Sequence, residues 1–449
     1  MQMTFLPETA AGFRDPAFSK NRQLPLHRWV PWVAGFSAGF VDDCLKKYLS
    51  NSPREDTWVL DPFAGVGTTL LEAYTQGLNV IGFEINPYAA LAAKLKLEAL
   101  HIPKESLCKH IAAFERFMEK SCSRNDRCLP RSKPPAGFSG RNELFSPKVE
   151  RKALFALDFI NGIEKRQIRD LFRLAFGSIM VSFSNYSYEP SLTRRSAVSK
   201  MPIEDAEMTH VLSGKLSLML RDILWLQDHM KRMGRNPEGH VINASILTAR
   251  EALSHPLPAD LVITSPPYLN NYHYPRNTRP QIHWLGFSDG PGYSGARESE
   301  SFGKFWQTVR GCQPVGLIFP FPTLEQIISG IRSLNTEKGA YGGPGWANYV
   351  ATYFNDTHRF CRVLGEMLRP NGVAVVVLGN SIIQGVEVKT DYFFGMIAEF
   401  CGLRFEDTIP LRKKRTGSSI IQSSVRVDKA AAKTVLYESA IVLRKDAPT

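Results

Sequence analysis

The chain has 449 residues, a length that suits one large α/β domain with an added module. Hydrophobic residues make up 43% and charged residues 22%, as in ordinary globular proteins, and no run of eighteen apolar residues predicts a transmembrane helix. Met1 to Leu26 lacks the basic start and apolar stretch of a secretory signal, and the seven cysteines contain no Cys-x-x-Cys pair, so we expect a cytoplasmic protein without a zinc site.

Positive charge is concentrated in two segments of a chain whose formal net charge is +12. His101 to Asn236 has 24 Lys and Arg residues against 15 Asp and Glu, and Leu411 to Thr449 has 9 against 3. These segments carry +9 and +6, which leaves −3 for the rest of the chain. Clustered positive charge is typical of proteins that bind a polyanion, although a solvated basic surface gives the same count.

The first elements predict half of a doubly wound α/β sheet. Ser37 can cap a short helix, and Trp58 to Leu60 is a short apolar strand. A Gly-rich turn follows from Asp61 to Gly67, then a helix from Thr68 to Gln76 and a second strand from Asn79 to Phe83. This strand–turn–helix–strand unit of about thirty residues is the building block of such sheets.

The middle of the chain is interpreted as an insertion. A helix from Pro87 to Leu100 ends the first part, and the domain boundaries are predicted at residues 1–100, 101–236 and 237–449. The middle part is expected to be largely helical. Its predicted helices are Leu144 to Ile163, Arg166 to Val181 and Thr209 to Met233.

The sheet pattern resumes after the insertion. The predicted strands are His240 to Ile242, Asp260 to Thr264, Val373 to Leu378 and Thr434 to Leu443, and the predicted helices are Asn348 to Leu368 and Thr390 to Phe400. Leu269 to Ala347 is expected to be loop-rich, and Leu411 to Lys433 is polar, basic and expected to be mobile.

Two glycines stand out in the turn Asp61-Pro62-Phe63-Ala64-Gly65-Val66-Gly67-Thr68-Thr69. A turn between a strand and a helix lets a ligand touch the backbone only if side chains do not block it, and glycine removes them. The helix that follows offers free N–H groups to a carboxylate or phosphate. No Gly-Lys-Ser/Thr follows, so the turn is not a P-loop.

Glu84 ends the next strand, seventeen residues after Gly67. An acidic residue at this place can accept hydrogen bonds from both ribose hydroxyls of a nucleoside cofactor. An exposed glutamate opening a loop is the alternative.

The segment Thr264-Ser265-Pro266-Pro267-Tyr268 ends a later strand. The prolines fix φ and remove two N–H donors, so the chain stays extended with the Ser265 hydroxyl and nearby carbonyls as acceptors. An exocyclic amino group is a donor that such acceptors recognise, and Tyr268 offers a face on which a base can stack. A rigid Pro-Pro turn with a packed tyrosine is the alternative.

The two motifs together resemble the amino-methyltransferases of DNA, which methylate cytosine N4 or adenine N6 in restriction–modification and related systems. The resemblance covers residues 25–100 and 237–449, and the Ser-Pro-Pro-Tyr version is similar to the N4-cytosine branch. It implies a Rossmann-like S-adenosylmethionine-dependent methyltransferase sheet, a flipped target base and double-stranded DNA as substrate. It makes the insertion at residues 101–236 a possible DNA-recognition region. A restriction or defence-system partner would accompany such an enzyme.

The resemblance also implies roles for individual residues. Ser265, Pro266, Pro267 and Tyr268 would be catalytic. Residues that would bind the cofactor are Asp61, Phe63, Gly65, Gly67, Thr68, Thr69, Glu84, Asn243, Phe36 and Ser37. Glu84 would hold the ribose and Asn243 the adenine, while Thr68 and Thr69 would lie near the carboxylate.

The nucleic-acid contacts are expected where aromatic and basic residues interleave after the catalytic motif, and in the two basic segments. The candidates are Tyr272, Tyr274, Arg276, Arg279, Arg194, Arg195, Lys413, Lys414 and Arg415. A polar lid held by core tyrosines is the alternative for the segment after the motif.

Other functions stay open. RNA amino methylation is one alternative, and a degenerate methylase that only binds nucleic acid is another. C5-cytosine methylation needs a cysteine nucleophile after a proline, and Cys312 precedes Pro314 and lies far from the Pro-Pro-Tyr motif, so it is interpreted as structural.

Overall fold

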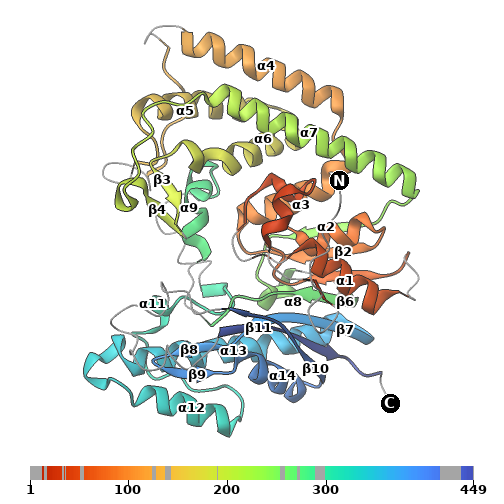
Figure 1. Ribbon diagram of the computed structural model, residues 1–449, viewed down its shortest axis with the longest axis vertical. Coiled ribbons are helices and arrows are strands. Elements are labelled where there is room, and N and C mark those ends of the chain that lie inside the picture. Colours follow the sequence, from red (N-terminus) through yellow and green to blue (C-terminus); the bar gives the residue numbers. More distant parts are fainter. Residues whose placement is uncertain are drawn as a thin grey trace.

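The computed structural model describes residues 13–14, 18–32, 35, 37–50, 55–123, 128–136, 143–189, 191–252, 258–269, 274–288, 299–414 and 436–447. Figure 1 shows an α/β sheet domain with a layer of helices from the middle of the chain above it. Among these residues no helix is long and apolar enough to cross a membrane, and no cluster of His, Cys, Asp and Glu could hold a metal ion. All seven cysteines are free.

A seven-stranded sheet forms the centre of the molecule, in the order β10-β11-β7-β6-β1-β2-β5. Its strands are β1 (Trp58–Asp61), β2 (Asn79–Phe83), β5 (Gly239–Ile242), β6 (Ala259–Thr264), β7 (Leu368–Gly379), β10 (Arg404–Lys414) and β11 (Leu436–Arg444). β11 is antiparallel to both of its neighbours, whereas β5, β2, β1, β6 and β7 pair in parallel. This is the doubly wound sheet that the sequence predicts.

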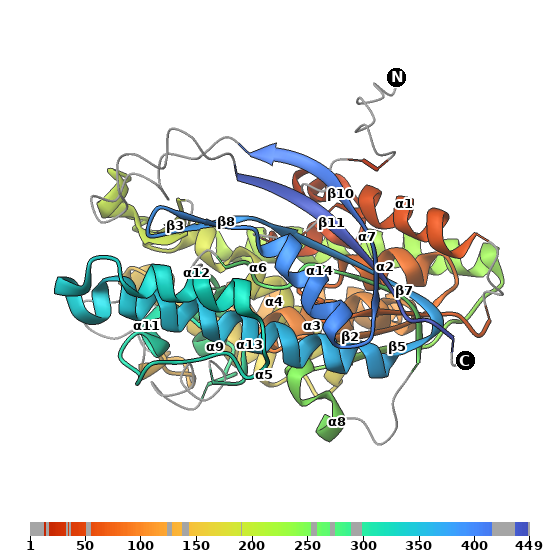
Figure 2. The ribbon, with the colours of Figure 1, turned by 90° about the horizontal axis from the view of Figure 1, so that it is seen from below.

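Helices cover both faces of the sheet (Figure 2). Val59 and Val80 pack in one core with α1 (Ala38–Leu49), α2 (Thr68–Thr75) and α3 (Pro87–Glu98). Their neighbours Leu60 and Ile81 pack in a second core with α13 (Gly343–Met367) and α14 (Thr390–Phe400). Successive side chains of a strand point to opposite faces, so a strand that is apolar throughout contributes side chains to both cores.

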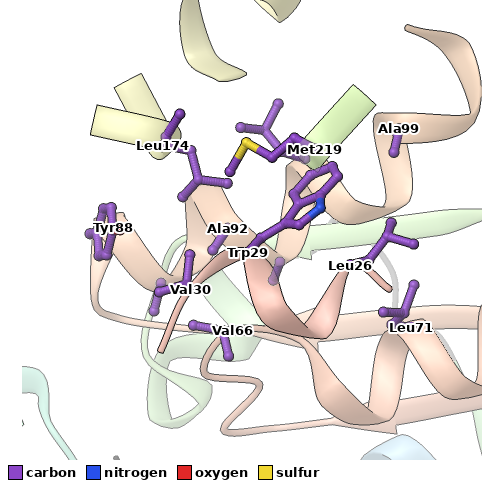
Figure 3. Close-up of a cluster of buried hydrophobic side chains, with 14 of the residues drawn as sticks. Leu26, Trp29, Val30, Val66, Leu71, Tyr88, Ala92, Ala99, Leu174 and Met219 are labelled. Carbon is purple, nitrogen blue, oxygen red and sulfur yellow. The ribbon is translucent and has the colours of Figure 1, made fainter. Parts of the chain in front are cut away.

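Between α3 and β5, the described residues form four α-helices and a small hairpin. The helices are α4 (Lys104–Ser123), α5 (Pro147–Asn161), α6 (Arg166–Ile179) and α7 (Met208–Met233), and the hairpin strands are β3 (Tyr186–Tyr188) and β4 (Leu192–Arg194). Figure 3 shows Trp29 and Val30 of the N-terminal segment packed between Met219 and Leu174 of this region and Ala92 of α3. The inserted helices therefore share one hydrophobic core with the first half of the sheet.

The remaining elements are short. They are α8 (Ala249–Ala252), β8 (Ser381–Ile383), β9 (Val386–Val388) and the 3-10 helices η1 (Phe18–Gln23), η2 (His27–Trp29), η3 (Ala99–His101), η6 (Met180–Phe183), η7 (Arg195–Val198), η8 (Ile246–Thr248) and η9 (Thr336–Tyr341).

Two sequence expectations for secondary structure were wrong. The segment expected to be loop-rich contains α9 (Tyr274–Trp284), α11 (Trp306–Val309) and α12 (Pro322–Arg332). In α12 the buried residues Leu324, Ile328 and Ile331 follow helical spacing, but the surrounding glycines and serines obscure it. Residues 411–414, expected to be mobile, belong to β10, and residues 415–433 lie outside the described residues.

Candidate active site

The Gly-rich turn after β1 has a conformation that needs glycine. Gly65 and Gly67 have φ of 52° and 79°, in the left-handed region that side chains disfavour. A Cβ on Gly67 would lie 2.9 Å from the Cβ of Ala93, and one on Gly65 would lie 3.1 Å from Trp32 Nε1. Gly67 also caps α2, so the turn delivers the chain directly to a helix N-terminus. Larger residues would strain the turn and close the space around it.

Glu84 is fixed at the end of β2 by two backbone donors. Its Oε2 accepts a hydrogen bond from the Gly65 N–H and its Oε1 accepts one from the Asn86 N–H, both at 2.7 Å. Burial raises the pKa of Glu84 to about 7, although both hydrogen bonds favour the ionised form. A carboxylate has about four lone-pair positions, so two remain for hydroxyl donors of a ligand.

A buried lysine on α3 holds the same turn by a hydrogen bond to its backbone. Lys96 of α3 is fully buried, and its Nζ donates to the carbonyl of Val66 at 2.6 Å, between the two glycines. Burial lowers the pKa of Lys96 to about 7, and the charge of Lys215 lowers it further. The carbonyl of Val66 is thereby held toward the interior of the protein rather than toward the ligand side.

One hydrogen bond joins the Gly-rich turn to the Pro-Pro-Tyr motif. Asp61 at the end of β1 accepts from the Thr264 hydroxyl at the end of β6 at 2.7 Å, and from the Phe63 N–H at 3.1 Å. Asp61 is buried, and burial raises its pKa to about 6. Residues 203 positions apart thus meet because β1 and β6 are adjacent parallel strands whose carboxyl ends lie at one edge of the sheet.

The Ser-Pro-Pro-Tyr segment continues from β6, and side-chain hydrogen bonds hold it in place. The Ser265 hydroxyl donates to the carbonyl of Val377 at 3.1 Å, and the Tyr353 hydroxyl donates to the carbonyl of Pro267 at 3.1 Å. The Tyr268 hydroxyl donates to Glu438 Oε1 at 3.4 Å. Because Ser265 uses its proton on Val377, its oxygen is left as an acceptor on the other side.

A partly buried ion pair lies behind Tyr268. Glu438 on β11 is 5% exposed and pairs with Arg412, its cross-strand partner on β10. The last two strands of the sheet therefore contribute to the surroundings of the motif, although the sequence places them about 150 residues away from it.

Several predicted cofactor residues have structural contacts. Phe63 packs edge-on against Phe302 and Phe360, and the Thr69 hydroxyl donates to the carbonyl of Ile263 in β6. Thr68 is buried in the first turn of α2, and Ser37 caps α1 by accepting from the Phe40 N–H. The predicted cap at Ser37 is therefore confirmed, whereas contact of these side chains with a cofactor stays a prediction.

Asn243 follows β5 and contacts the backbone beside Glu84. Its Nδ2 donates to the carbonyl of Glu84 at 2.7 Å and to that of Ile85 at 3.3 Å. The structure thus brings Asn243, Glu84 and the Gly-rich turn together at one edge of the sheet. Phe36 lies outside the described residues.

Four of the seven basic candidates lie on α9, on the hairpin beside it and on η7, which follows the hairpin. Arg276 and Arg279 are exposed on α9, Arg194 is exposed on β4, and Arg195 opens η7. The hairpin is attached to α9 through Asn277, whose Oδ1 accepts from the Leu192 N–H at 2.9 Å. Tyr272 and Arg415 lie outside the described residues, and the side chains of Tyr274, Lys413 and Lys414 are not described.

Sequence reasoning missed five residues at this site: Trp32, Lys96, Tyr353, Arg412 and Glu438. Lys96 gave a weak signal, because it lies on the apolar face of the α3 pattern where a cation needs a partner. The other four are ordinary core or strand residues in the sequence, and only the fold brings them to the motif.

The site and the doubly wound sheet define a Rossmann-like methyltransferase. Residues 18–95 match the N6/N4 methyltransferase family model, described as DNA methylase. The chain is 23% identical to the Type II methyltransferase M.BsoBI of Geobacillus stearothermophilus over 438 residues, which covers 90% of this chain and 83% of the relative. It is 22% identical to the Type II methyltransferase M.AvaI of Nostoc sp., over 90% of this chain and 84% of the relative.

Among solved structures, an rRNA methyltransferase, aviRa from Streptomyces viridochromogenes, aligns over 95% of this chain and 92% of its own, with 11% identity and a TM-score of 0.31. The family match and the Type II relatives confirm the resemblance carried by the two motifs, and they support a DNA amino-methyltransferase of the type that acts on cytosine N4 or adenine N6.

Proposed function

We propose that this enzyme transfers a methyl group from S-adenosylmethionine to the exocyclic amino nitrogen of an extruded base in double-stranded DNA, and that the base is cytosine. The observation that carries the proposal is the 2.7 Å hydrogen bond between Thr264 and Asp61. It joins the segment suited to an amino group to the turn suited to a nucleoside cofactor. A methyl donor and an acceptor amine must meet at such a junction.

The residues around the Gly-rich turn fit S-adenosylmethionine. Gly65 and Gly67 leave backbone open to the ligand, and the N-terminus of α2 offers N–H groups to its carboxylate. Glu84 has two remaining acceptor positions for the ribose hydroxyls. When bound, the cofactor would supply a methyl group already activated by a sulfonium charge.

The Ser265–Tyr268 segment would hold and orient the amine. The Ser265 oxygen and the carbonyl of Pro266 would accept the two amino protons, because both are acceptors and the prolines supply no competing N–H. These hydrogen bonds draw the nitrogen lone pair out of the ring system and toward the methyl donor. Positioning and polarisation account for most of the rate in such a step, and no covalent enzyme intermediate is needed.

Tyr268 would support the base that leaves the duplex. Enzymes that act on a base atom extrude the nucleotide into a pocket and commonly stack it on an aromatic ring. Glu438 would fix the Tyr268 ring by accepting its hydroxyl proton, and Arg412 would hold Glu438 in place by donating to its other oxygen. Among the motif variants of the family, Ser at position 265 favours cytosine as the target over adenine.

The DNA backbone would be contacted by Arg276 and Arg279 on α9, by Arg194 on the hairpin and by Arg195 in η7. α9 begins six residues after Tyr268, so a duplex whose base reaches the motif passes close to this helix. Arginines on a helix so close in sequence to the motif are suited to contact the phosphates of the flanking nucleotides. A restriction endonuclease with the same recognition sequence is the partner that we propose for the cell.

The proposal is tested by incubating the purified protein with labelled S-adenosylmethionine and unmodified genomic DNA, then digesting the DNA to nucleosides. We expect the label in N4-methylcytosine, and none in total RNA treated in parallel. Label in N6-methyladenine would correct the target base alone. Label only in RNA, or in 5-methylcytosine, would contradict the proposal.

A further inference from the structure

A three-residue segment, Phe302 to Lys304, packs against the Gly-rich turn and against the helix beside the Pro-Pro-Tyr motif. The Phe302 side chain is 3% exposed, and its ring lies edge-on to Phe63 of the turn, with 5.3 Å between the ring centroids. The same ring lies edge-on to Tyr353 of α13, also at 5.3 Å. Aromatic rings favour this edge-to-face arrangement over a stacked one without offset. Phe302 therefore connects the Gly-rich turn to the helix that holds the motif.

Gly303 brings the backbone of this segment against the motif itself. It has φ of 61°, in the left-handed region that favours glycine. A Cβ at this position would lie 3.1 Å from Tyr353 Cδ2 and 3.8 Å from Pro267 Cβ. The segment thus lies directly on the ring of Tyr353, and a side chain at position 303 would push that ring.

Asp356 of α13 anchors the segment by charge. Its side chain is fully buried, and its Oδ2 accepts from the Gly303 N–H at 3.2 Å and lies 3.7 Å from Lys304 Nζ. Arg359 pairs with the other carboxylate oxygen at 3.2 Å. These partners offset the cost of burying a carboxylate. The segment is therefore held to α13 by polar contacts as well as by packing.

The residues of α13 that hold the segment share one face of the helix. Tyr353, Asp356 and Phe360 are three and four positions apart, the spacing of neighbouring side chains on a helix. The Phe360 ring adds to the packing at 6.0 Å from the Phe302 ring. From the same face, the Tyr353 hydroxyl donates to the carbonyl of Pro267 at 3.1 Å. A displacement of the Phe302 ring would therefore reach the motif through Tyr353.

We propose that Phe302 is a positioning residue for methyl transfer, because it sets the place of Tyr353, and thereby of Pro267, relative to the Gly-rich turn. The inference rests on the proposed function, in which an amine held by Ser265 and Pro266 attacks a methyl group held at that turn. Such a step depends on the distance between the two groups, and a misplacement of about 1 Å can cost about 100-fold in rate. Phe302 acts on the rate through this distance.

The test compares Phe302→Leu with Phe394→Leu, a control in the same hydrophobic core. Phe394 is fully buried in α14, and its ring packs against Phe360 at 6.0 Å, so its replacement costs core packing away from Tyr353. We expect similar falls in melting temperature in the two variants. A structural role alone would leave their rates of methyl transfer equal.

The measured quantity is the single-turnover rate of transfer from S-adenosylmethionine to genomic DNA. This rate should fall at least about ten-fold in Phe302→Leu, while the dissociation constants for the cofactor and for DNA stay within about two-fold of those of the unaltered protein. Phe394→Leu should keep the rate of the unaltered protein. Equal rates in the two folded variants would overturn the inference.

Hydrogen exchange gives a second readout that needs no catalysis. The peptide that spans residues 264–269 should exchange faster in Phe302→Leu than in the unaltered protein, because the motif loses its support through Tyr353. Its exchange in Phe394→Leu should be unchanged. Equal exchange of this peptide in the two variants would contradict the link between Phe302 and the motif.

Gly303→Ala tests the same contact by adding a methyl group instead of removing a ring. The added methyl group would displace the ring of Tyr353, so we expect the rate of transfer to fall as in Phe302→Leu. Gly311→Ala meets no atom within 4 Å and is the control, which should keep the full rate. Full transfer by folded Gly303→Ala would contradict the inference.

Failure of the proposed function would look different. The unaltered protein would then bind no S-adenosylhomocysteine and methylate no DNA. Failure of this inference alone would leave the unaltered protein active and Phe302→Leu as fast as Phe394→Leu. In either case the exchange measurement tests the contact between Phe302 and the motif.

Discussion

At the residue scale, the charge of Glu84 should determine how tightly the Gly-rich turn and its neighbours bind the cofactor. Burial raises its pKa to about 7, so the carboxyl is protonated below that pH and ionised above it. Protonation turns one acceptor into a donor and removes a partner from the ribose hydroxyls. Binding of S-adenosylmethionine should therefore tighten as pH rises from 6 to 8.

Glu84→Gln should abolish most of this pH dependence and weaken cofactor binding by roughly ten-fold, because hydrogen bonds to a charged group contribute about 1.5–3 kcal/mol. Calorimetric titration at several pH values measures both effects. Lys96, with a pKa lowered to about 7, titrates in both proteins and sets the residual slope. Glu98→Gln, on the surface of α3, is the control. An unchanged pH profile in Glu84→Gln would show that Glu84 does not hold the ligand.

The backbone conformation at position 67 requires glycine. Gly67→Ala would place a Cβ at φ 79° and 2.9 Å from Ala93. We expect a loss of about 1–3 kcal/mol of unfolding free energy from the backbone conformation alone, and weaker cofactor binding. Gly330→Ala in α12 meets no atom within 4 Å and should be neutral or stabilising by chemical denaturation. Equal stability of the two variants would contradict the strained geometry.

At the element scale, α7 of the inserted helices holds the N-terminal segment against the cofactor side of the sheet. Asp222 is 1% exposed and accepts from the Leu26 N–H, the Arg28 guanidinium and the Trp29 indole N–H. The Lys215 Nζ donates to the carbonyl of Arg28 from the same helix. These bonds fix the segment that carries Trp32 to Gly65.

Asp222→Asn should destabilise the protein by about 2–3 kcal/mol, less than the 3–5 kcal/mol typical of a fully buried pair because Arg28 is 30% exposed. Cofactor binding should weaken with it, because the Trp32 segment loses its anchor. Asp228→Asn is the control on the same helix: its pair with Arg232 is exposed, and its loss should cost less than about 0.5 kcal/mol. A cofactor affinity that is unaltered in folded Asp222→Asn would refute the link between α7 and the site.

Elements with a clear periodic pattern could be predicted from the sequence. The strand Asn79–Phe83 is found with the predicted bounds, and β1 and β6 with one residue of difference at one end, because each is a short apolar run next to a turn. α4 was not predicted, since its charged face hides the buried residues Leu107, Ile111, Phe114 and Met118.

Contacts of the site that depend on the fold could not be predicted. Tyr353 reaches the carbonyl of Pro267 from the middle of α13, and Glu438 reaches Tyr268 from the last strand. Neither residue has a local pattern that distinguishes it from a core aromatic or a strand glutamate. The motifs themselves could be recognised in the sequence, because their glycines and prolines determine the backbone conformation of the segment in which they lie.

At the scale of the whole molecule, the hairpin β3–β4 lies beside α9 (Figure 1), and Arg194, Arg276 and Arg279 on these elements are exposed. Each phosphate contact adds about 0.9 to the slope of log affinity against log salt concentration. Arg194→Glu with Arg195→Glu should weaken binding to duplex DNA and reduce this slope by roughly 1–2.

Reversal of Arg116 and Lys120, exposed on the outer helix α4, provides the control with the same change in net charge. Fluorescence anisotropy with a labelled duplex at several salt concentrations measures both slopes. Equal slopes for the two double variants would show that net charge, and not the hairpin, governs the interaction.

The central claim is that one site has two halves, a cofactor half at Gly65 to Glu84 and an amine half at Ser265 to Tyr268. The most direct measurement compares cofactor binding by calorimetry with methyl transfer to DNA in the folded Ser265→Ala variant. The account predicts unchanged cofactor affinity and a loss of transfer of at least about 100-fold, as for removal of one preorganised polar group. Full transfer by this variant, or equal loss of binding and transfer, would contradict the division of the site.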